Sequence, residues 1–282
     1  MSPRPYGTDG VTVRFGRRVA LDDVSLEVPA GEVTGVVGGD GAGKTTLLRV
    51  LAGALEPEAG SVRRPDAKRI GYLASTSGTY PDLSVDENLQ FAATAYGVPV
   101  DEAQRRAADY LERTGLAAVG GRLAGNLSGG MRQKLGVVRA LVHQPELVVL
   151  DEPTTGVDPV SRADLWWLIA RAAADGAAVV TSTTYLDEAE RAARLLVVDA
   201  GRSLATGDPV EIVRSIPGTI RRTVERPTGD AARRAWRRRA EWRVWDADGH
   251  PSPGMDGSIR PDLQDAVTVL ALERELAHGG GA

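Results

Sequence analysis

The chain of 282 residues contains no cysteine and only three histidines, His143, His250 and His278. Without cysteine there can be no disulfide framework and no thiolate metal site. A metal held by imidazole would have to use these three side chains. The chain is long enough to bury a full core and to form one large domain with an appendage.

Long apolar runs are also missing from the sequence. No stretch approaches the ~20 apolar residues that cross a bilayer, and the opening MSPRPYGTDG lacks the apolar core of a signal peptide. We therefore expect a cytoplasmic chain whose membrane role, if it has one, comes through a partner. The formal net charge of −4 argues against a generally nucleic-acid-binding surface but does not exclude a local basic patch.

A glycine-rich stretch, GGDGAGKTT, fits the phosphate-loop pattern of a glycine, four residues, and then Gly-Lys-Thr. Glycines let backbone N–H groups turn inward around an anion, the lysine reaches the β and γ phosphates, and the threonine hydroxyl can bind Mg²⁺. Thr45 is therefore a predicted metal ligand. The residues predicted to bind nucleotide are Gly38, Gly39, Asp40, Gly41, Ala42, Gly43, Lys44, Thr45 and Thr46.

The residues on both sides of this loop supply the context that the pattern needs. Val33–Val37 is a β-branched run suited to a buried strand, and residues 45–55 are rich in leucine and alanine, as a helix would be. The N-terminus of that helix offers unpaired N–H groups and a partial positive charge to phosphates. The sequence thus predicts a nucleoside triphosphate site at a strand-to-helix junction.

Two carboxylates follow a second buried-looking run at residues 147–150. Asp151, at the strand end, is predicted to hold Mg²⁺ through water, and Glu152 to polarise an attacking water. The alternative is an acidic turn without a function, which the upstream phosphate loop disfavours.

Ser128, Gly129 and Gly130 precede a helix that we expect over residues 131–143. Ser128 is a natural N-cap, and the glycines expose backbone N–H groups, so this is a second helix start suited to an anion. One nucleotide rarely needs two such starts from one subunit.

With these motifs in this order, the chain resembles the ATP-binding subunits of ABC transporters over residues 11–212, especially those of drug and polysaccharide exporters with separate permease chains. In that family two such domains dimerise head to tail, and each lends a signature to the nucleotide on the other. The signature is matched here by Leu127 to Gly130, with Met131 where glutamine is commoner. The resemblance implies ATP and Mg²⁺ as ligands, integral-membrane permease partners, and a peripheral place on the cytoplasmic face of the membrane. No nucleic acid is expected.

The resemblance implies an α/β fold of the P-loop NTPase class, with a RecA-like parallel core, an N-terminal antiparallel β part and a helical insert. The residue pattern itself predicts strands at 69–74, 178–182 and 195–199, and an insert over about 84–127 with helices at 85–96 and 101–114. We expect a nucleotide-binding domain over residues 1–215 and a small appended domain over 216–282.

Other positions follow from the resemblance one at a time. Phe15 stands where an aromatic ring stacks on adenine, although a lone aromatic is as common in a core. Asp158 lies in what looks like the loop that crosses the dimer interface, and it is also the expected cap of a helix with Pro159 at its first position. Residues 80–89 are similar to the segment that contacts the permease.

Two positions depart from the family pattern. Ser75 stands where the family has a glutamine that touches the metal and the attacking water, and Thr184 where it has a histidine that contacts the γ-phosphate. Neither replacement reaches as far, and threonine cannot carry the charge or the proton of imidazole. Losing two donors at the transition state is expected to slow hydrolysis by roughly 10²-fold or more. The alternative is a variant that stays fast with Glu152 and Lys44 alone.

In a head-to-tail dimer these two losses fall on one site, the one that holds this chain's Lys44, whereas the opposite site uses its intact signature. We therefore expect a heterodimer with a competent second ATP-binding subunit, and a homodimer as the less favoured arrangement. A regulatory subunit with little hydrolysis of its own is a second hypothesis, and a soluble ABC-type protein of translation or DNA repair is a third.

Beyond residue 215 the chain is dense in arginine, with tryptophans interleaved at Trp236, Trp242 and Trp245. Such a stretch can bind nucleic acid or an anionic membrane face. Interspersed acidic residues dilute the charge and favour the solvated surface of a small domain. A closing helix is expected over residues 263–276.

Overall fold

The computed structural model describes residues 4–247 and 257–279. By their internal contacts they divide into two compact units, Met1–Ser203 and Leu204–Ala282. The sequence predicts this boundary later, near residue 215. Helix α7 (Pro209–Ser215), which lies between the two positions, packs with the C-terminal helix α9 (Leu263–Gly279) of the smaller unit.

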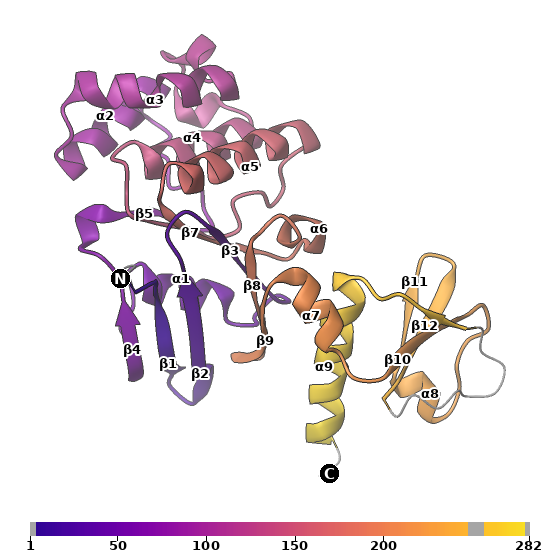
Figure 1. Cartoon of the computed structure of the whole chain (residues 1–282). Helices are drawn as coiled ribbons and strands as arrows, with labels where there is room; N and C mark the ends of the chain where they lie inside the picture. Colours follow the sequence, from indigo (N-terminus) through magenta and orange to yellow (C-terminus); the bar gives the residue numbers. More distant parts are fainter. Residues whose placement is uncertain (1–3, 248–256, 280–282) are drawn as a thin grey trace. The chain divides into compact units, whose positions relative to one another are not determined.

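A six-stranded sheet with the order β5-β6-β7-β3-β8-β9 lies at the centre of the larger unit (Figure 1). Its first five strands in this order are parallel. Every residue of β3, β6 and β7 is buried, as expected for strands covered on both faces. The strands are β3 (Val33–Val37), β5 (Ile70–Leu73), β6 (Leu147–Leu150), β7 (Ala178–Thr183), β8 (Arg194–Asp199) and β9 (Arg202–Gly207).

A second sheet is antiparallel and has the order β2-β1-β4, from β1 (Tyr6–Phe15), β2 (Arg18–Val28) and β4 (Ala59–Arg63). Helix α1 (Lys44–Leu51) packs between this sheet and the parallel one. Its apolar side chains join a buried core with Val11 and Leu21 of the antiparallel sheet and Val149 of the parallel sheet. This packing fixes the end of the phosphate loop against both sheets.

The opposite side of the parallel sheet carries α4 (Gly129–Leu141) and α5 (Pro159–Ala174), and the short α6 (Leu186–Ala189) follows β7 (Figure 1). The predicted insert contains α2 (Val85–Tyr96) and α3 (Val100–Thr114). Ser84 and Glu87 form the expected capping box at the start of α2, and Gly97 and Gly115 end the two helices in the left-handed region. Two short 3₁₀ turns, Ala117–Val119 and Ala124–Asn126, complete the insert, which has no strand in this fully described stretch.

The smaller unit has a four-stranded sheet with the order β11-β12-β10-β13. A core of Ile220, Trp245 and Val269 joins this sheet to α9, and the Trp245 indole N–H donates to the Pro217 carbonyl at 2.8 Å. The elements are α7 (Pro209–Ser215), β10 (Thr219–Thr223), α8 (Asp230–Arg233), β11 (Ala235–Arg238), β12 (Glu241–Asp246), β13 (Ser258–Ile259) and α9 (Leu263–Gly279).

Part of the arginine-rich stretch has a structural role in this unit. Arg238 and Arg243 both pair with the fully buried carboxylate of Asp265 on α9, and Arg221 pairs with the buried Asp246 at 3.0 Å. Buried charges paired in this way bind sheet to helix. Arg238 and Arg243 therefore join the sheet to α9, and Arg221 joins β10 to β12, so these three arginines are paired within the small domain.

His143, just after α4, is a buried titratable group in the larger unit. Its ring stacks on Tyr96 at 3.6 Å between centroids, and its Nε2 lies 3.2 Å from the Ile70 carbonyl oxygen. Burial lowers the pKa of His143 from its ordinary value of 6.5 to about 4. The folded protein therefore holds a neutral imidazole at neutral pH.

Because the folded protein holds this imidazole neutral, we expect its free energy of unfolding to fall in mild acid. Since the pKa of His143 is lower in the folded than in the unfolded chain, stability is lost as pH falls from 6.5 towards 4, by about 2 kcal/mol at pH 5. In His143→Phe, which keeps a ring against Tyr96 but does not titrate, the drop in Tm between pH 7 and pH 5 should shrink. Thermal melting at both pH values measures this. An equal drop in the two proteins would contradict it.

Candidate functional site

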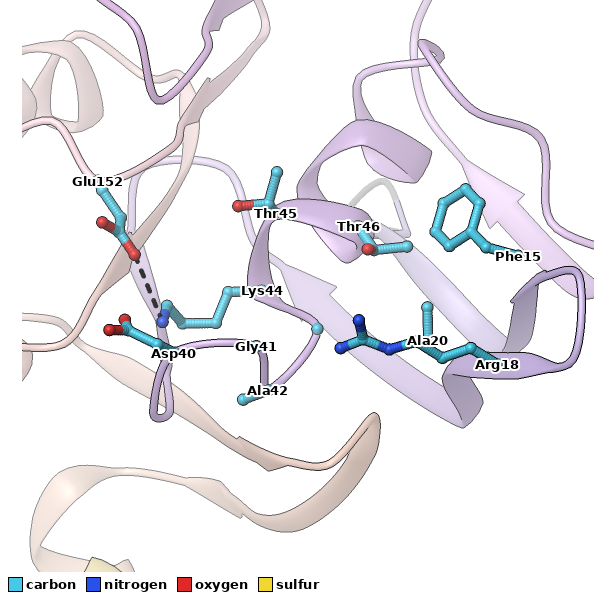
Figure 2. Close-up of a pocket in the computed structure, with 11 residues that line it drawn as sticks. Phe15, Arg18, Ala20, Asp40, Gly41, Ala42, Lys44, Thr45, Thr46 and Glu152 are labelled. Carbon is cyan, nitrogen blue, oxygen red and sulfur yellow. Dashed lines mark ion pairs between the residues drawn. The ribbon is translucent and has the colours of Figure 1, made fainter.

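The phosphate loop connects β3 to α1 and forms the floor of a cavity of about 200 Å³ (Figure 2). The turn between β1 and β2 forms one wall of this cavity, and Glu152, after β6, contributes from the other side. The lining residues are Phe15, Arg18, Ala20, Asp40, Gly41, Ala42, Gly43, Lys44, Thr45, Thr46 and Glu152. Nine residues predicted from the sequence therefore meet in one cavity.

Two glycines of this loop are required by the backbone. Gly43 has φ of 109° at the N-terminal cap of α1, a conformation that side chains rarely allow. A Cβ on Gly38 would lie 2.2 Å from the Val198 carbonyl oxygen, which is too close for any side chain. The loop can therefore press against β8 while its N–H groups stay available to an anion.

Lys44 lies inside the loop, with only 4% of its side chain exposed. Its Nζ donates to the carbonyl oxygens of Gly38 at 2.9 Å and Gly39 at 3.1 Å. The same nitrogen lies 3.4 Å from Glu152 Oε1 (Figure 2). One ammonium thus connects the loop after β3 with the turn after β6, across the intervening strand β7.

Asp151 and Glu152 are held by Ser182 at the end of β7. The Ser182 hydroxyl donates to Asp151 Oδ1 at 2.7 Å and accepts from the Glu152 backbone N–H at 2.9 Å. Glu152 has φ of 50°, unusual for a residue with a side chain, and the hydrogen bond from its N–H supports that conformation. Ser182 therefore orients both carboxylates.

The oxygens near the loop suit a magnesium ion. Asp151 is fully buried, and its Oδ2 has no hydrogen-bond partner among the described residues. The Thr45 hydroxyl faces the same side of the cavity as Glu152 (Figure 2). No group of three or more His, Cys, Asp or Glu side chains suited to a metal occurs in the described part of the chain. Mg²⁺ takes few protein ligands and shares phosphate oxygens, so these residues fit it together with a bound phosphate.

Phe15 lines the cavity and is 53% exposed. A large aromatic ring that remains so open to solvent has no packing role. This placement favours the stacking interpretation over the core interpretation for this side chain.

Ser75 and Thr184 are both exposed and lie outside the residues that line the cavity. The turn that carries Thr184 is nevertheless well anchored. Glu188, 2% exposed, accepts from Thr183 Oγ1 at 3.0 Å and from Thr154 Oγ1 at 2.6 Å, and it pairs with Arg162 at 3.3 Å. The neighbouring turn is therefore held in place whichever side chain occupies position 184.

Ser128, Gly129 and Gly130 start α4 and do not line the cavity. Ser128 Oγ accepts from the Met131 N–H at 3.2 Å, as an N-cap should. Gly129 opens to free space, whereas a Cβ on Gly130 would lie 2.9 Å from Ser161 Oγ. This helix start is consequently available to a ligand that the same chain's phosphate loop does not reach.

Asp158 is the N-cap of α5, as expected, and accepts from the N–H groups of Val160 and Ser161 at 3.0 Å each. The hydrogen bonds from Ser161 lower the pKa of the Asp158 carboxyl. Its Oδ2 would lie 3.3 Å from a Cβ on Gly130. The loop before α5 and the start of α4 are therefore adjacent.

Tyr80, at the start of the segment over residues 80–89, forms an exposed aromatic surface with Phe91, which lies just beyond that segment. Tyr80 and Phe91, 44% and 47% exposed, meet edge to face at 4.7 Å between centroids. Arg139 on α4 lies 5.1 Å from the Tyr80 ring. This surface has the apolar and aromatic character of a protein contact.

Sequence reasoning missed three residues near the cavity: Arg18, Ser182 and Glu188. Arg18 pairs with Phe15 across the β1–β2 turn, so a predicted hairpin would have placed it beside that ring. Ser182 ends the strand next to β6, and the carboxyl ends of neighbouring parallel strands meet at one edge. Nothing in the sequence alone indicates the buried hydrogen bonds of Glu188.

No helix among the described residues is long and apolar enough to span a membrane.

Comparison with known proteins places this site in a family. Residues 21–155 match the family model described as ABC transporter. The chain is 42% identical over 209 residues to the probable multidrug ABC transporter ATP-binding protein YbhF of Escherichia coli, covering 71% of this chain but only 36% of that protein. It is 37% identical over 212 residues to the Nod factor export ATP-binding protein I of Cupriavidus metallidurans, covering 71% of this chain and 70% of that protein.

A solved structure described as the ATP binding subunit of an ABC transporter superposes with a TM-score of 0.68 at 29% identity, over 74% of this chain and 92% of that chain. The predicted P-loop NTPase fold is thereby confirmed. With the phosphate loop, the paired carboxylates and the second helix start in their expected order, the chain belongs to the family of ABC transporter ATP-binding proteins.

Proposed function

We propose that this chain binds MgATP in the cavity at the phosphate loop and hydrolyses it to drive an exporter whose permease is a separate chain. The observation that carries the proposal is the convergence of Phe15, Lys44 and Glu152 on one cavity from three separate segments. Adenine would stack on the exposed ring, and the triphosphate would lie along the loop towards Glu152.

In this proposal the Lys44 ammonium changes its partners when the nucleotide binds. In the structure its ammonium contacts two loop carbonyls and Glu152. Phosphate oxygens are stronger acceptors for an ammonium than neutral carbonyls, so the incoming β and γ phosphates would take it over. Transfer of the ammonium frees Glu152 Oε1 to accept a proton from water.

Glu152 is the general base of the proposed hydrolysis, because its carboxylate lines the cavity beside Lys44, with Oε1 3.4 Å from the ammonium that the γ-phosphate would take over. Thr155 Oγ1 donates to its Oε2 at 3.2 Å, which leaves Oε1 for water. Asp151 Oδ2 and the Thr45 hydroxyl would hold Mg²⁺, which supplies neutralising charge to the phosphates when bound.

The transport role is supported by the relatives, one named for a multidrug transporter and one for Nod factor export. The chain itself offers the exposed Tyr80 and Phe91 as a contact for integral-membrane permease subunits. In this proposal the chain would bind peripherally to the cytoplasmic face of the membrane.

The start of α4 favours a second ATP-binding subunit as a further partner. Ser128 and Gly129 lie open and away from the cavity of their own chain, so they would serve a nucleotide held by a neighbour. Ser75 and Thr184 would weaken only the site that contains this chain's Lys44. We therefore favour a heterodimer in which the neighbour supplies competent catalytic residues.

A regulatory subunit that binds ATP but hydrolyses little is the second candidate. It is favoured by one observation: no imidazole lines the cavity in the described part of the chain, and Thr184 is exposed outside it.

Removal of the loop ammonium tests the binding site. Lys44→Ala should abolish MgATP binding, because it deletes the cation that reaches the β and γ phosphates. Glu152→Gln is the matched control: the amide keeps the shape of the carboxylate and should preserve binding while hydrolysis is lost. Nucleotide titration followed by tryptophan or ligand fluorescence measures both. Unchanged affinity in Lys44→Ala would remove the loop from the site.

Introducing glutamine at position 75 and histidine at position 184 tests the proposal that Ser75 and Thr184 slow hydrolysis at this chain's own site. Ser75→Gln with Thr184→His should raise kcat about tenfold or more with little change in KM, because the added groups act in the transition state and the loop sets ground-state binding. Steady-state ATPase assays of wild type and the double variant decide it. Brisk wild-type turnover that the double variant does not increase would show that Ser75 and Thr184 are not limiting.

A further inference from the structure

We propose that Arg18 is a nucleotide-binding residue that contacts the α-phosphate beside the adenine ring. This inference rests on the proposed function, because it assigns a further contact within the same cavity. Arg18 lines the cavity together with Phe15 and the phosphate loop.

The β1–β2 turn sets the direction of the Arg18 side chain. Phe15 and Arg18 are paired directly across the turn, with Gly16 and Arg17 between them. Residues opposite each other in an antiparallel pair project from the same face, so the side chains of Phe15 and Arg18 leave the hairpin on the same side. Arg17, at the turn itself, is exposed and does not line the cavity.

The guanidinium of Arg18 reaches the phosphate loop. A Cβ built on Gly41 would lie 3.8 Å from one of its terminal nitrogens. Figure 2 shows the group extending from β2 to the part of the loop near Ala42 and Thr46, on the same side as Phe15. The group therefore spans the distance between the aromatic wall and the loop.

Charge within the cavity favours an anionic ligand for this guanidinium. Four ionisable side chains line the cavity, namely Arg18, Asp40, Lys44 and Glu152. Lys44 is already paired with Glu152 at 3.4 Å, whereas Arg18 has no ion-pair partner among the described residues. Of the two cations that line the cavity, Arg18 is therefore the one without a carboxylate partner among the described residues.

The position of Arg18 along the cavity indicates which phosphate of the nucleotide it would contact. Lys44 and Glu152 lie at the end where the γ-phosphate would be, and Phe15 lies at the base end. The α-phosphate is the one nearest the base, so it would lie closest to Arg18. A planar guanidinium suits the bidentate binding of phosphate oxygens.

This placement predicts how affinity depends on the number of phosphates. Arg18→Ala should raise the Kd for ATP and for ADP by about tenfold each, because both carry the α-phosphate, and should leave adenosine binding unchanged. Arg18→Lys should fall between wild type and Arg18→Ala.

Arg17→Ala is the matched control for this experiment, because it removes the same charge from the neighbouring residue outside the cavity. Isothermal titration of wild type, Arg18→Ala and Arg17→Ala with ATP, ADP and adenosine, with Tm measured for each, decides the proposal. A selective tenfold loss in Arg18→Ala for both nucleotides supports it. Equal affinities in the two alanine variants, or an equal loss for adenosine, would overturn it.

Failure of this inference is distinguishable from failure of the proposed function. If wild type binds MgATP and Lys44→Ala does not, the cavity is the nucleotide site whatever the Arg18 variants show. If wild type does not bind MgATP, the proposed function itself fails.

Discussion

The site depends on the charge of one buried ammonium. Lys44 Nζ contacts the carbonyl oxygens of Gly38 and Gly39 and pairs with Glu152, so it joins the loop after β3 to the turn after β6. An ammonium almost excluded from water needs such partners, since an unpaired buried charge is strongly destabilising. The two carbonyl oxygens are also weaker acceptors for an ammonium than phosphate oxygens. The arrangement thus stabilises the loop, and the proposed function has Lys44 exchange these partners for a nucleotide.

Strand β7 lies between β3 and β6 and provides the second constraint. Ser182 at its end holds Asp151 and Glu152 by two hydrogen bonds, and Thr183 beside it contacts the buried Glu188. Glu188 in turn reaches Thr154 and Arg162, on the segments that follow the carboxylates. The turn bearing Thr184 is therefore connected to the carboxylate turn by buried hydrogen bonds and an ion pair.

Several elements were predictable because the signals are local. The β-branched strand Val33–Val37, the capping box that starts α2 and the Asp158-Pro159 start of α5 have the predicted positions, since residue type and spacing alone determine them. The phosphate-loop residues were predictable for the same reason. Ser182 was not, because its proximity to the carboxylates arises from pairing between strands distant in sequence. Arg18 was missed for another reason, because its pairing with Phe15 is local and needed only the hairpin to be recognised. Helix α1 ends at Leu51, four residues before the predicted end, since Gly53 then adopts φ of 77°.

The central claim is that Lys44 exchanges its protein partners for phosphate when MgATP binds. A crystal structure of Glu152→Gln, which should bind but not hydrolyse ATP, grown with MgATP tests this most directly. The account predicts Lys44 Nζ within hydrogen-bond distance of β- and γ-phosphate oxygens and no longer on the Gly38 and Gly39 carbonyls, with the base on Phe15. Nucleotide bound elsewhere, with Lys44 still on both carbonyls, would contradict it.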